Sequence, residues 1–435
     1  MRICVVALGK IGLPLAVQYA SKGHEVVGYD ISQRVVELVN DGVAPFPGEA
    51  GLDALLKEVV ADGRLTATTD GTAAARGAEA IVVVVPLIVD AQDVPDFGPL
   101  DAATETIAAG LARGAVVSYE TTLPVGTTRE RFAPLLEAGS GLIAGTDFGV
   151  VFSPERVLTG RVFADLRKYP KLVGGIDAYS TELGIAFYRA VLDFDARTDL
   201  ARPNGVWDLG TAEAAELAKL AETTYRDVNI GLANTFARFA DKAGLDIAKV
   251  IEACNSQPYS HIHQPGIAVG GHCIPVYPRM YLWNDPEAQV VRSARETNAA
   301  MPAYAVGLLA GAHGELAGQR VAVLGVAYRG AVKETAFSGV FGVVEALRSR
   351  GALPLVCDPM YTEDEIRALG FEPYLAGTRV DAAVIQTDHQ EYRQLTPADL
   401  PGVKTLVDGR RITDPAAWTG VTRRLIGDGT GSASA

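Results

Sequence analysis

The chain has 435 residues, of which 48% are hydrophobic and 21% are charged, and these proportions suit two or three packed globular domains. A formal net charge of −13 argues against nucleic acid and acidic membrane surfaces as partners, because their phosphates would be repelled. The opening MRICVVALGK is too short an apolar run for a signal-peptide core, and the later AIVVVVPLIV is far shorter than the roughly 20 residues that span a bilayer. We therefore expect a cytoplasmic protein without a membrane segment.

The four cysteines are Cys4, Cys254, Cys273 and Cys357. They stand far apart and form no CxxC pair, so neither a disulfide framework nor a zinc site fits their spacing. We expect free thiols and no metal site.

The N-terminal region alternates short apolar runs with longer segments of helical periodicity. The runs cover residues 3–8, 26–29, 80–85 and 115–118. This alternation predicts a parallel sheet with crossover helices, and we assign residues 1–205 to one doubly wound α/β domain.

The turn in VVALGKIGLPLA is the first chemical signal. Gly9 and Gly12 stand between a strand and a helix, where glycines let the backbone approach a pyrophosphate and the helix N-terminus attracts it. Asp30 ends the second strand, where a carboxylate can accept both ribose hydroxyls and would repel a 2′-phosphate, so NAD is favoured over NADP. A glycine turn needed only to pack the helix on the sheet is the alternative.

Further candidate cofactor contacts follow the next strands, at the carboxyl edge where such sheets bind ligands. Thr121 and Thr122 in YETTLPVGTT could reach the nicotinamide end, although threonines also close turns. The candidate cofactor-binding residues from this domain are Gly9, Lys10, Ile11, Gly12, Asp30, Arg34, Pro86, Thr121 and Thr122.

The middle of the chain predicts one helix of about thirty residues. Leu217, Leu220, Val228, Leu232, Phe236 and Phe239 recur at three- and four-residue intervals, Thr211 can cap the start, and Gly244 can end it. Helices of this length usually bridge domains or subunits, so we expect a homodimer face within a central helical domain, residues 206–302. A long core helix is an equal alternative.

Polar residues mark another side of this helix. Lys219, Thr223 and Arg226 are four and then three residues apart, so they project together, away from the apolar stripe. Solvated charges are the alternative explanation, above all for Arg226. A cation at Lys219 would stabilise a thiolate or an oxyanion if this side turned toward a reactive cysteine.

The C-terminal region repeats the N-terminal order of strand, glycine turn, helix, strand and aspartate. GQRVAVLGVAYRG covers residues 318–330, a helix is expected near 339–349, and LPLVCDP covers 353–359. We therefore predict an α/β fold with two Rossmann-like domains joined by the central helical region, the second at residues 303–427. The small, polar end, residues 428–435, is expected to be disordered.

The run IAVGGHCIPVYPRMY sets Cys273 apart from the other cysteines, which we expect to be inert packing in strands and a helix. Gly270 and Gly271 permit unusual backbone angles, and two prolines stiffen the chain beyond, so the thiol stands on rigid, accessible backbone. His272 can lower its pKa. A nucleophilic thiol beside NAD suggests aldehyde oxidation, in which a thiohemiacetal loses hydride and the thioester is hydrolysed to an acid.

Nearly the whole chain resembles the nucleotide-sugar 6-dehydrogenase family. The matching stretches are ALGKIGLPLA, ETTLPVGTT, VFSPERVLTGR, AELAKLAETTYRDVNIGLAN, GGHCIPVYP and VAVLGVAYRGAVKE. The resemblance implies an N-terminal NAD domain, a central dimer helix, a C-terminal UDP-binding domain, and oxidation of a sugar C6 alcohol to the carboxylate with two NAD. The histidine before the cysteine is similar to the UDP-N-acetylhexosamine branch, which implies UDP-N-acetylglucosamine or UDP-N-acetylmannosamine as substrate.

The resemblance also implies roles for individual residues. Cys273 takes the nucleophile's place and Lys219 that of the lysine that stabilises oxyanions and holds the sugar. Glu155 of SPER takes the place of the general acid/base and also joins the cofactor contacts, and Lys333 that of a lysine bridging the ligand sites. Thr223 and Tyr277 complete the candidate catalytic set. The candidate substrate-binding residues are Arg156, Lys219, Arg226, His261, Gly270, Gly271, His272, Tyr328 and Lys333.

Four positions depart from the family pattern. Ala7 replaces the first fingerprint glycine at a cost that we expect to be small, and the run ETAFSG after Lys333 lacks an arginine. Thr223 replaces an asparagine, and Tyr277 replaces an aspartate with a phenol that is a poor base at neutral pH. Either Glu155, His272 or a water takes over that work, or the second oxidation and hydrolysis are slow. An enzyme that stops at the aldehyde or oxidises another hydroxylated substrate, and a non-catalytic nucleotide-sugar binder, are the alternatives.

Overall fold

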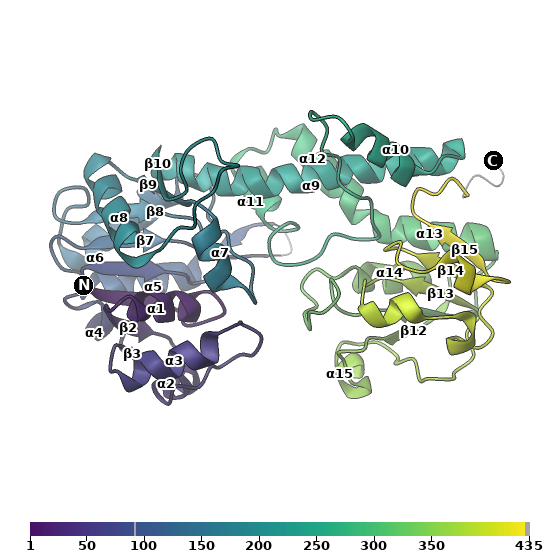
Figure 1. Cartoon of the computed structure of the whole chain (residues 1–435), viewed down its shortest axis with the longest axis horizontal. Coiled ribbons are helices and arrows are strands. Elements are labelled where there is room, and N and C mark those ends of the chain that lie inside the picture. The colour runs from purple at the N-terminus through teal and green to yellow at the C-terminus, as the bar shows by residue number, and fades with distance from the viewer. Residues whose placement is uncertain (91–92, 431–435) are drawn as a thin grey trace. The chain divides into compact units, whose positions relative to one another are not determined.

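The computed structural model describes residues 1–90 and 93–430. The chain divides into two compact units, Met1–Glu222 and Thr223–Ala435, and each contains a largely parallel sheet with helices on both sides (Figure 1). The predicted α/β class with two Rossmann-like sheets is confirmed. Within the described residues, every helix is too short or too polar to cross a lipid bilayer.

The sheet of the first unit has the strand order β10-β9-β8-β7-β4-β1-β2-β3. Its strands are β1 (Arg2–Val6), β2 (Glu25–Tyr29), β3 (Leu65–Thr68), β4 (Ala80–Val83), β7 (Val116–Tyr119), β8 (Gly149–Phe152), β9 (Lys171–Gly175) and β10 (Val206–Thr211). The strands predicted from the apolar runs are confirmed as β1, β2, β4 and β7. Neighbours pair in parallel except β8 and β9, which are antiparallel. Because β9 is reversed, its first residue, Lys171, lies at the edge where β7 and β8 end.

Helices cover both faces of this sheet. On one face, apolar side chains of α1 (Gly12–Ser21), α2 (Gln33–Asn40), α3 (Leu52–Ala61), α7 (Val162–Lys168) and α8 (Ala178–Val191) form the core with the strands. The helices α4 (Gly71–Ala75), α5 (Gly98–Ala108) and α6 (Ala133–Ser140) pack together over the other face, with the π-helical turn η1 (Thr128–Phe132) leading into α6. A short hairpin of β5 (Ile88–Val89) and β6 (Pro95–Asp96) follows β4.

The β1–α1 turn explains two residue choices. A Cβ at Gly12 would lie 1.9 Å from the carbonyl oxygen of Ala7, so only glycine lets α1 pack this closely on β1. Packing therefore accounts for Gly12. Ala7 has a φ of +74°, in the left-handed region that penalises any Cβ. The expectation that Ala7 costs little is thus corrected, because the strain comes from its backbone angle and not from its size.

The second unit holds a five-stranded parallel sheet in the order β12-β11-β13-β14-β15. Its strands are β11 (Arg320–Leu324), β12 (Leu353–Cys357), β13 (Ala382–Ile385), β14 (Thr405–Asp408) and β15 (Thr422–Leu425). The helices are α10 (Ile247–Asn255), α11 (Tyr277–Asn284), α12 (Gln289–Ala299), α13 (Met301–His313), α14 (Gly339–Arg348) and α15 (Glu363–Ala368). The predicted repeat of the N-terminal order is confirmed by β11, α14 and β12. Residues 428–430 of the predicted tail form a turn, and residues 431–435 lie outside the described part.

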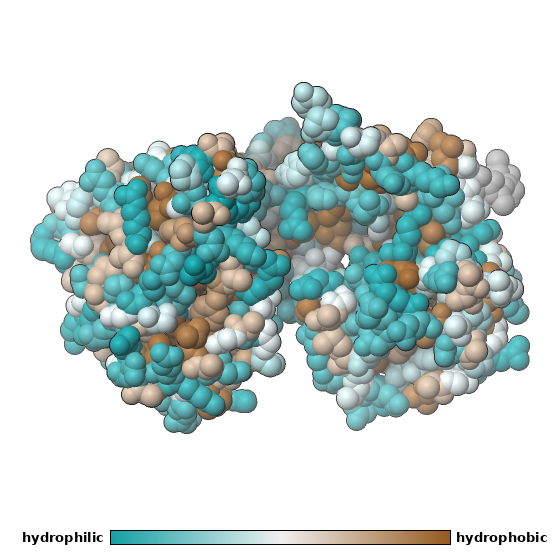
Figure 2. Space-filling model, viewed as in Figure 1, coloured by the Kyte–Doolittle hydropathy of each residue, from teal (hydrophilic) through white to brown (hydrophobic). Residues whose placement is uncertain are grey.

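The predicted long helix is confirmed as α9 (Ala212–Ala243), which spans 32 residues. The Thr211 hydroxyl oxygen accepts the Ala214 N–H at 3.2 Å, and Gly244, with φ of +71°, ends the helix. Of the apolar stripe, Leu220 is buried and Val228 half-buried, whereas Leu217, Leu232, Phe236 and Phe239 are exposed. Apolar patches also interrupt the mostly hydrophilic surface seen in Figure 2. The polar side chains of Lys219 and Thr223 are buried instead.

Replacing Ala7 by glycine should stabilise the protein. Relief of the left-handed strain should raise the free energy of unfolding by up to about 1 kcal/mol in chemical denaturation. The matched control is Gly12→Ala, which should lower it by about 1–3 kcal/mol because the added methyl overlaps the Ala7 carbonyl. An unchanged or lowered stability for Ala7→Gly would contradict the strain.

Candidate functional site

The turn after β1 offers its backbone to a ligand. A Cβ built at Gly9 meets no atom within 4 Å, Gly9 and Lys10 are exposed, and Ile11 is half-buried just before α1 begins. Open space at Gly9 and the N–H groups of the first turn of α1 suit an approaching pyrophosphate. These residues therefore fit the NAD that the sequence predicts.

Asp30 holds this turn in place. Its Oδ2 accepts the Leu8 N–H at 2.8 Å and its Oδ1 accepts the Ser32 N–H at 2.9 Å. Each carboxylate oxygen keeps acceptor capacity, which is what ribose hydroxyls need. Arg34 is exposed in α2 on the same edge of the sheet.

The candidates after β4 and β7 differ in exposure and in their contacts. Pro86 is exposed beyond β4. The Thr121 hydroxyl donates to the Val85 carbonyl at 2.7 Å, so this threonine does tie the two strand ends together. Thr122 is buried beside it.

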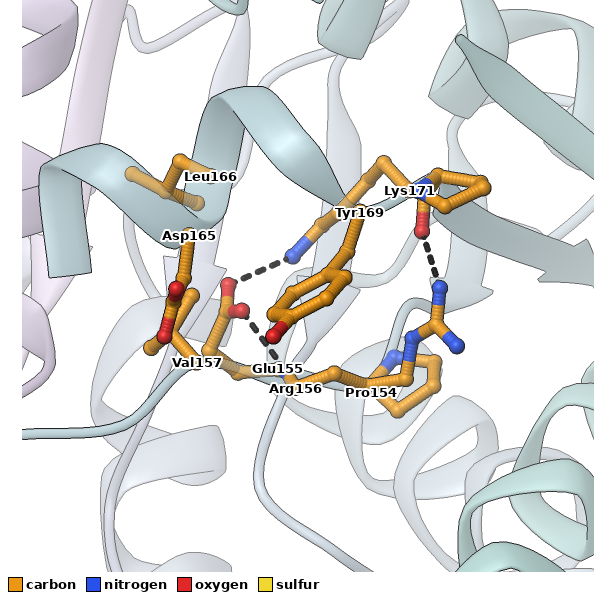
Figure 3. Close-up of a pocket in the computed structure, with 9 residues that line it drawn as sticks. Pro154, Glu155, Arg156, Val157, Asp165, Leu166, Tyr169 and Lys171 are labelled. Carbon is orange, nitrogen blue, oxygen red and sulfur yellow. Dashed lines mark hydrogen bonds and ion pairs between the residues drawn. The ribbon is translucent and has the colours of Figure 1, made fainter. Parts of the chain in front are cut away.

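A buried charge cluster stands at the same edge. Lys171 Nζ lies 2.7 Å from Glu120 Oε2 and 3.0 Å from Glu155 Oε2. Figure 3 shows the Glu155 carboxylate pointing toward the Lys171 ammonium, with Tyr169 and Asp165 lining the same small cavity. Glu155 comes from the loop after β8 and Glu120 from the end of β7, so three strand ends converge on one ammonium group.

Sequence reasoning found Glu155 but missed Glu120 and Lys171. In YETT a glutamate directly follows a buried strand, and in KLVGG a lysine begins one. Charged residues are seldom buried without a partner, so these two positions were the signal that the sequence offered. Two more hydroxyls complete the cluster. Tyr188 donates to Glu120 Oε1 at 2.6 Å, and the Tyr19 hydroxyl lies 3.5 Å from the same oxygen.

The cluster separates the acidities of its two carboxyls. Burial, opposed by the Lys171 ammonium, raises the pKa of Glu120 to about 7. Burial also disfavours the charge on Glu155, but Lys171 and the Arg156 N–H outweigh burial and lower the pKa of Glu155 below its usual value. Burial would lower the pKa of Lys171, yet the two carboxylates prevail and raise it. Near neutral pH, Glu155 is therefore the ionised carboxylate.

Two more candidates of the first unit meet at Glu155. Lys219 Nζ donates to the Glu155 carbonyl at 2.7 Å, and its side chain is only 8% exposed, so this lysine is not part of a solvated face. The Arg156 N–H donates to Glu155 Oε1 at 2.7 Å, and the Arg156 guanidinium lies 3.6 Å from Glu222. Thr223 follows Lys219 by one helical turn and is buried, and Arg226 is exposed.

In the second unit, Cys273 is exposed, whereas Cys4 and Cys357 have pKa values that burial raises to about 12. The Cys273 carbonyl accepts the N–H groups of Val276 and Tyr277 at 3.2 and 2.9 Å, which turns the chain directly into α11. The predicted accessible loop is confirmed in its geometry. Cys254 lies in α10, as expected.

Glycines fasten this loop to the start of the C-terminal sheet region. A Cβ at Gly270 would lie 2.5 Å from Tyr328 Cβ, and Gly271, with φ of +93°, donates to the Ala336 carbonyl at 2.8 Å. His272 Nε2 lies 3.0 Å from Glu334 Oε1. The structure thus brings Gly270, Gly271, His272 and Tyr328 together in and around the loop that carries Cys273.

The remaining candidates of the second unit make other contacts. The ammonium of Lys333 is 2.5 Å from Glu365 and stands over the Tyr361 ring at 5.2 Å. His261 is exposed, and its carbonyl accepts the Asn229 amide at 2.8 Å. Tyr277 is half-buried as the first residue of α11.

A second carboxylate-held turn follows β11. Asp358 Oδ2 accepts the N–H groups of Val326 and Ala327 at 2.7 and 3.0 Å and lies 3.0 Å from His389 Nε2. Burial acts to raise the pKa of Asp358, but the hydrogen bonds from His389 and from backbone N–H groups outweigh burial and lower this pKa below its usual value. The LPLVCDP pattern indicated this aspartate, whereas His389 carried no sequence signal.

The chain matches known proteins along nearly its whole length. Sequence profiles of the UDP-glucose/GDP-mannose dehydrogenase family match its NAD binding domain at residues 1–192, its central domain at 213–300 and its UDP binding domain at 322–415. A UDP-N-acetyl-D-mannosamine dehydrogenase from Pyrococcus horikoshii is 38% identical over 430 residues, which cover 95% of this chain and 96% of the relative. An NDP-N-acetyl-D-galactosaminuronic acid dehydrogenase from Ralstonia solanacearum is 32% identical over 406 residues, covering 90% and 92%.

Solved structures show the same similarity. The structure of a UDP-D-ManNAc dehydrogenase from Pyrococcus horikoshii matches with a TM-score of 0.87 at 36% identity, covering 99% of this chain and 100% of that one.

The raised pKa of Glu120 predicts a pH-dependent stability. The folded state binds this proton more tightly than the unfolded state does, so the stabilisation is complete below pH 4.5 and is lost as pH rises through about 7. Relative to the wild type, Glu120→Gln should therefore gain up to about 3 kcal/mol of unfolding free energy between about pH 5 and 8 in denaturant titrations. Glu213→Gln is the control, because the exposed Arg129 pair lowers the pKa of Glu213, and its difference from wild type should stay constant over that range. Parallel curves for wild type and Glu120→Gln would contradict the prediction.

Proposed function

This chain belongs to the UDP-glucose/GDP-mannose dehydrogenase family and is an NAD-dependent nucleotide-sugar dehydrogenase, and on that premise we propose UDP-N-acetyl-D-mannosamine as its substrate. The names of the similar enzymes from Pyrococcus horikoshii support this sugar, with UDP-N-acetylglucosamine as the second choice. The observation that carries the chemistry is the exposure of Cys273 on a loop whose glycines pack closely against Tyr328. Cys4, by contrast, is buried and inert.

The proposed roles are assigned to the three predicted domains, at residues 1–205, 206–302 and 303–427. In the first domain, NAD supplies the hydride acceptor when bound. Gly9 and the first turn of α1 would take its pyrophosphate and Asp30 its ribose, with Lys10, Ile11, Arg34, Pro86, Thr121 and Thr122 as the other proposed contacts. The space at Gly9 and the accepting oxygens of Asp30 support this assignment.

In the proposed reaction, Glu155 accepts the proton of the C6 hydroxyl while hydride leaves that carbon, which yields the aldehyde. The Cys273 thiolate adds to the aldehyde, and a second hydride loss leaves a thioester. After Glu155 has released its first proton to solvent, it takes a proton from the water that adds to the thioester carbon. The C–S bond then breaks, and the acid leaves as the thiolate is restored. Lys219 offers a positive charge to the oxyanions of these steps.

The unusual Tyr277 need not stop this sequence. Its phenol is a poor base, but the ionised Glu155 carboxylate is available for both proton removals. Thr223 and Tyr277 stay in the proposed catalytic set as the groups that shape the water and oxyanion sites. Arg156, Arg226, His261, Gly270, Gly271, His272, Tyr328 and Lys333 stay as proposed substrate contacts, and Asp358 and His389 join them for the nucleotide half because they border the glycine turn of the UDP-binding sheet.

We also propose a cytoplasmic homodimer that buries one side of α9. At 100° per residue, Tyr225, Leu232, Phe236 and Phe239 fall within an arc of about 60° on this helix, and all four are exposed. A surface helix normally exposes its polar side chains and buries its apolar ones, and α9 does the opposite. We therefore propose that a second copy of the chain packs on this row of large apolar side chains.

The reaction predicts two NADH per UDP-N-acetyl-D-mannosamine with the uronic acid as product. Cys273→Ala should lower the rate of acid formation by at least about 100-fold, because no thioester forms. The stoichiometry is measured by absorbance against sugar consumed, for this substrate, UDP-N-acetylglucosamine, UDP-glucose and GDP-mannose. Cys254→Ala is the matched control and should behave as the wild type.

Other outcomes would identify the alternatives. One NADH per sugar with aldehyde accumulation would show that the Tyr277 and Thr223 departures stop the second oxidation. An absence of NADH from all four sugars, with binding retained, would indicate a nucleotide-sugar binder.

The dimer predicts a clear effect of charge on α9. Phe239→Glu combined with Leu232→Glu should convert the dimer to a monomer in light scattering, since buried charges should weaken association by at least about 100-fold. Leu375→Glu, at an equally exposed leucine of the second unit, should leave the dimer intact. A monomeric wild type would overturn this proposal.

A further inference from the structure

The functional assignment leaves Glu120 and Lys171 without a role. Both side chains are almost completely buried, at 0% and 5% exposure, and the neighbouring Glu155 side chain is 12% exposed. Once Glu120 ionises, above about pH 7, two carboxylates and one ammonium group carry a net charge of −1 away from water. Buried ion pairs seldom stabilise a fold more than well-packed apolar residues would, so stability alone does not account for this cluster.

Several groups together fix the position of the Lys171 ammonium group. It sits between Glu120 Oε2 and Glu155 Oε2, and its Nζ also lies 4.8 Å from the centre of the Tyr188 ring. The far oxygen of Glu120 accepts Tyr188, whose hydroxyl is 2.6 Å from Ser118 Oγ. Groups from β7, β9 and α8 thus fix the Lys171 side chain.

The other charged groups near Glu155 are engaged elsewhere or bind its backbone. Lys219 on α9 donates to the Glu155 carbonyl and not to its carboxylate. Asp165 on α7, in the same cavity, pairs with Arg161 at 2.7 Å, and the Arg156 guanidinium faces Glu222. The tyrosines Tyr19, from α1, and Tyr188 reach Glu120 instead. Lys171 is therefore the ammonium whose hydrogen bond to the Glu155 carboxylate the structure shows.

Resting on the proposed role of Glu155 as base, we propose that Lys171 and Glu120 are positioning residues that fix the orientation and the charge of the Glu155 carboxylate. Lys171 binds Oε2, the Arg156 N–H binds Oε1, and so both oxygens are held with one face left for a proton. Glu120 is protonated below about pH 7 and keeps Lys171 in place as a neutral group. Removing the ammonium group should consequently raise the pKa of Glu155, whereas replacing Glu120 by the neutral glutamine of the same shape should leave it nearly unchanged.

The test is the pH profile of kcat/KM for NADH formation from UDP-N-acetyl-D-mannosamine. In Lys171→Met, Glu155 loses its cation and faces Glu120 directly, so the acid limb should shift upward by about one pH unit or more. In Glu120→Gln, an amide replaces a carboxyl that is already protonated in the acid range, so the acid limb should stay close to its wild-type position. Lys171→Arg preserves the charge and should restore the wild-type limb.

A purely structural role predicts a different pattern. Loss of packing would lower kcat/KM at every pH without moving the limb of Lys171→Met, or would move the limb of both variants equally, and either result overturns the proposal. Lys22→Met removes an exposed lysine that lies 2.7 Å from Asp193 in the same unit, and it should change nothing. If Lys171→Met does not fold, Lys171→Gln, which keeps a polar end group without the charge, replaces it, and Lys171→Arg remains its control.

A second measurement is independent of turnover. Infrared difference spectra between wild type and Glu155→Gln, recorded across pH in each background, report the titration of the Glu155 carboxyl without substrate. An upward shift is expected there for Lys171→Met and almost none for Glu120→Gln, and an unshifted titration in Lys171→Met overturns the proposal. If NADH never forms but this shift appears, the proposed function fails while the positioning of Glu155 stands.

Discussion

The ammonium group of Lys171 is the interaction on which the chemistry of the first unit depends. It satisfies Glu120 and Glu155 at once, at 2.7 and 3.0 Å, where neither carboxylate could stay charged alone. This cation stands between the acidic residues at the ends of β7 and β8 and offsets the repulsion between them when both are ionised. The reversed strand β9 makes this possible, since a parallel strand would carry Lys171 to the opposite edge of the sheet.

Both sheets use the same device to shape a ligand-binding turn. In the first, Asp30 accepts the N–H of Leu8, and in the second, Asp358 accepts those of Val326 and Ala327. A carboxylate at the end of the second strand thereby holds the turn after the first strand while its other lone pairs face outward. The two sheets therefore share this way of holding the turn as well as their strand order. Asp358 is also bound by His389, which has no counterpart among the bonds of Asp30.

The helix α9 serves its neighbours through its polar side. Lys219 binds the carbonyl of Glu155, and Asn229 and Asn234 bind the loop that precedes Cys273, through the His261 carbonyl and the Gly266 N–H. The polar groups are consequently turned inward and the large apolar ones outward. This arrangement explains why an apolar stripe that looks like the core side of a helix is exposed in the single chain.

The sequence by itself determined the features that depend on residues close together along the chain. These are the strands, from their apolar runs, and α9, from its three- and four-residue spacing with Thr211 and Gly244 at its ends. The accessible position of Cys273 between glycines and prolines is another. The sequence could not show the strain at Ala7, because a backbone angle of +74° follows from how α1 docks on β1. Nor could it join Glu120, Glu155 and Lys171, which are 35 and 16 residues apart. Their pairing arises from strand order and direction, and only the tertiary structure fixes both, because charges in a buried site choose partners by distance in space and not along the chain.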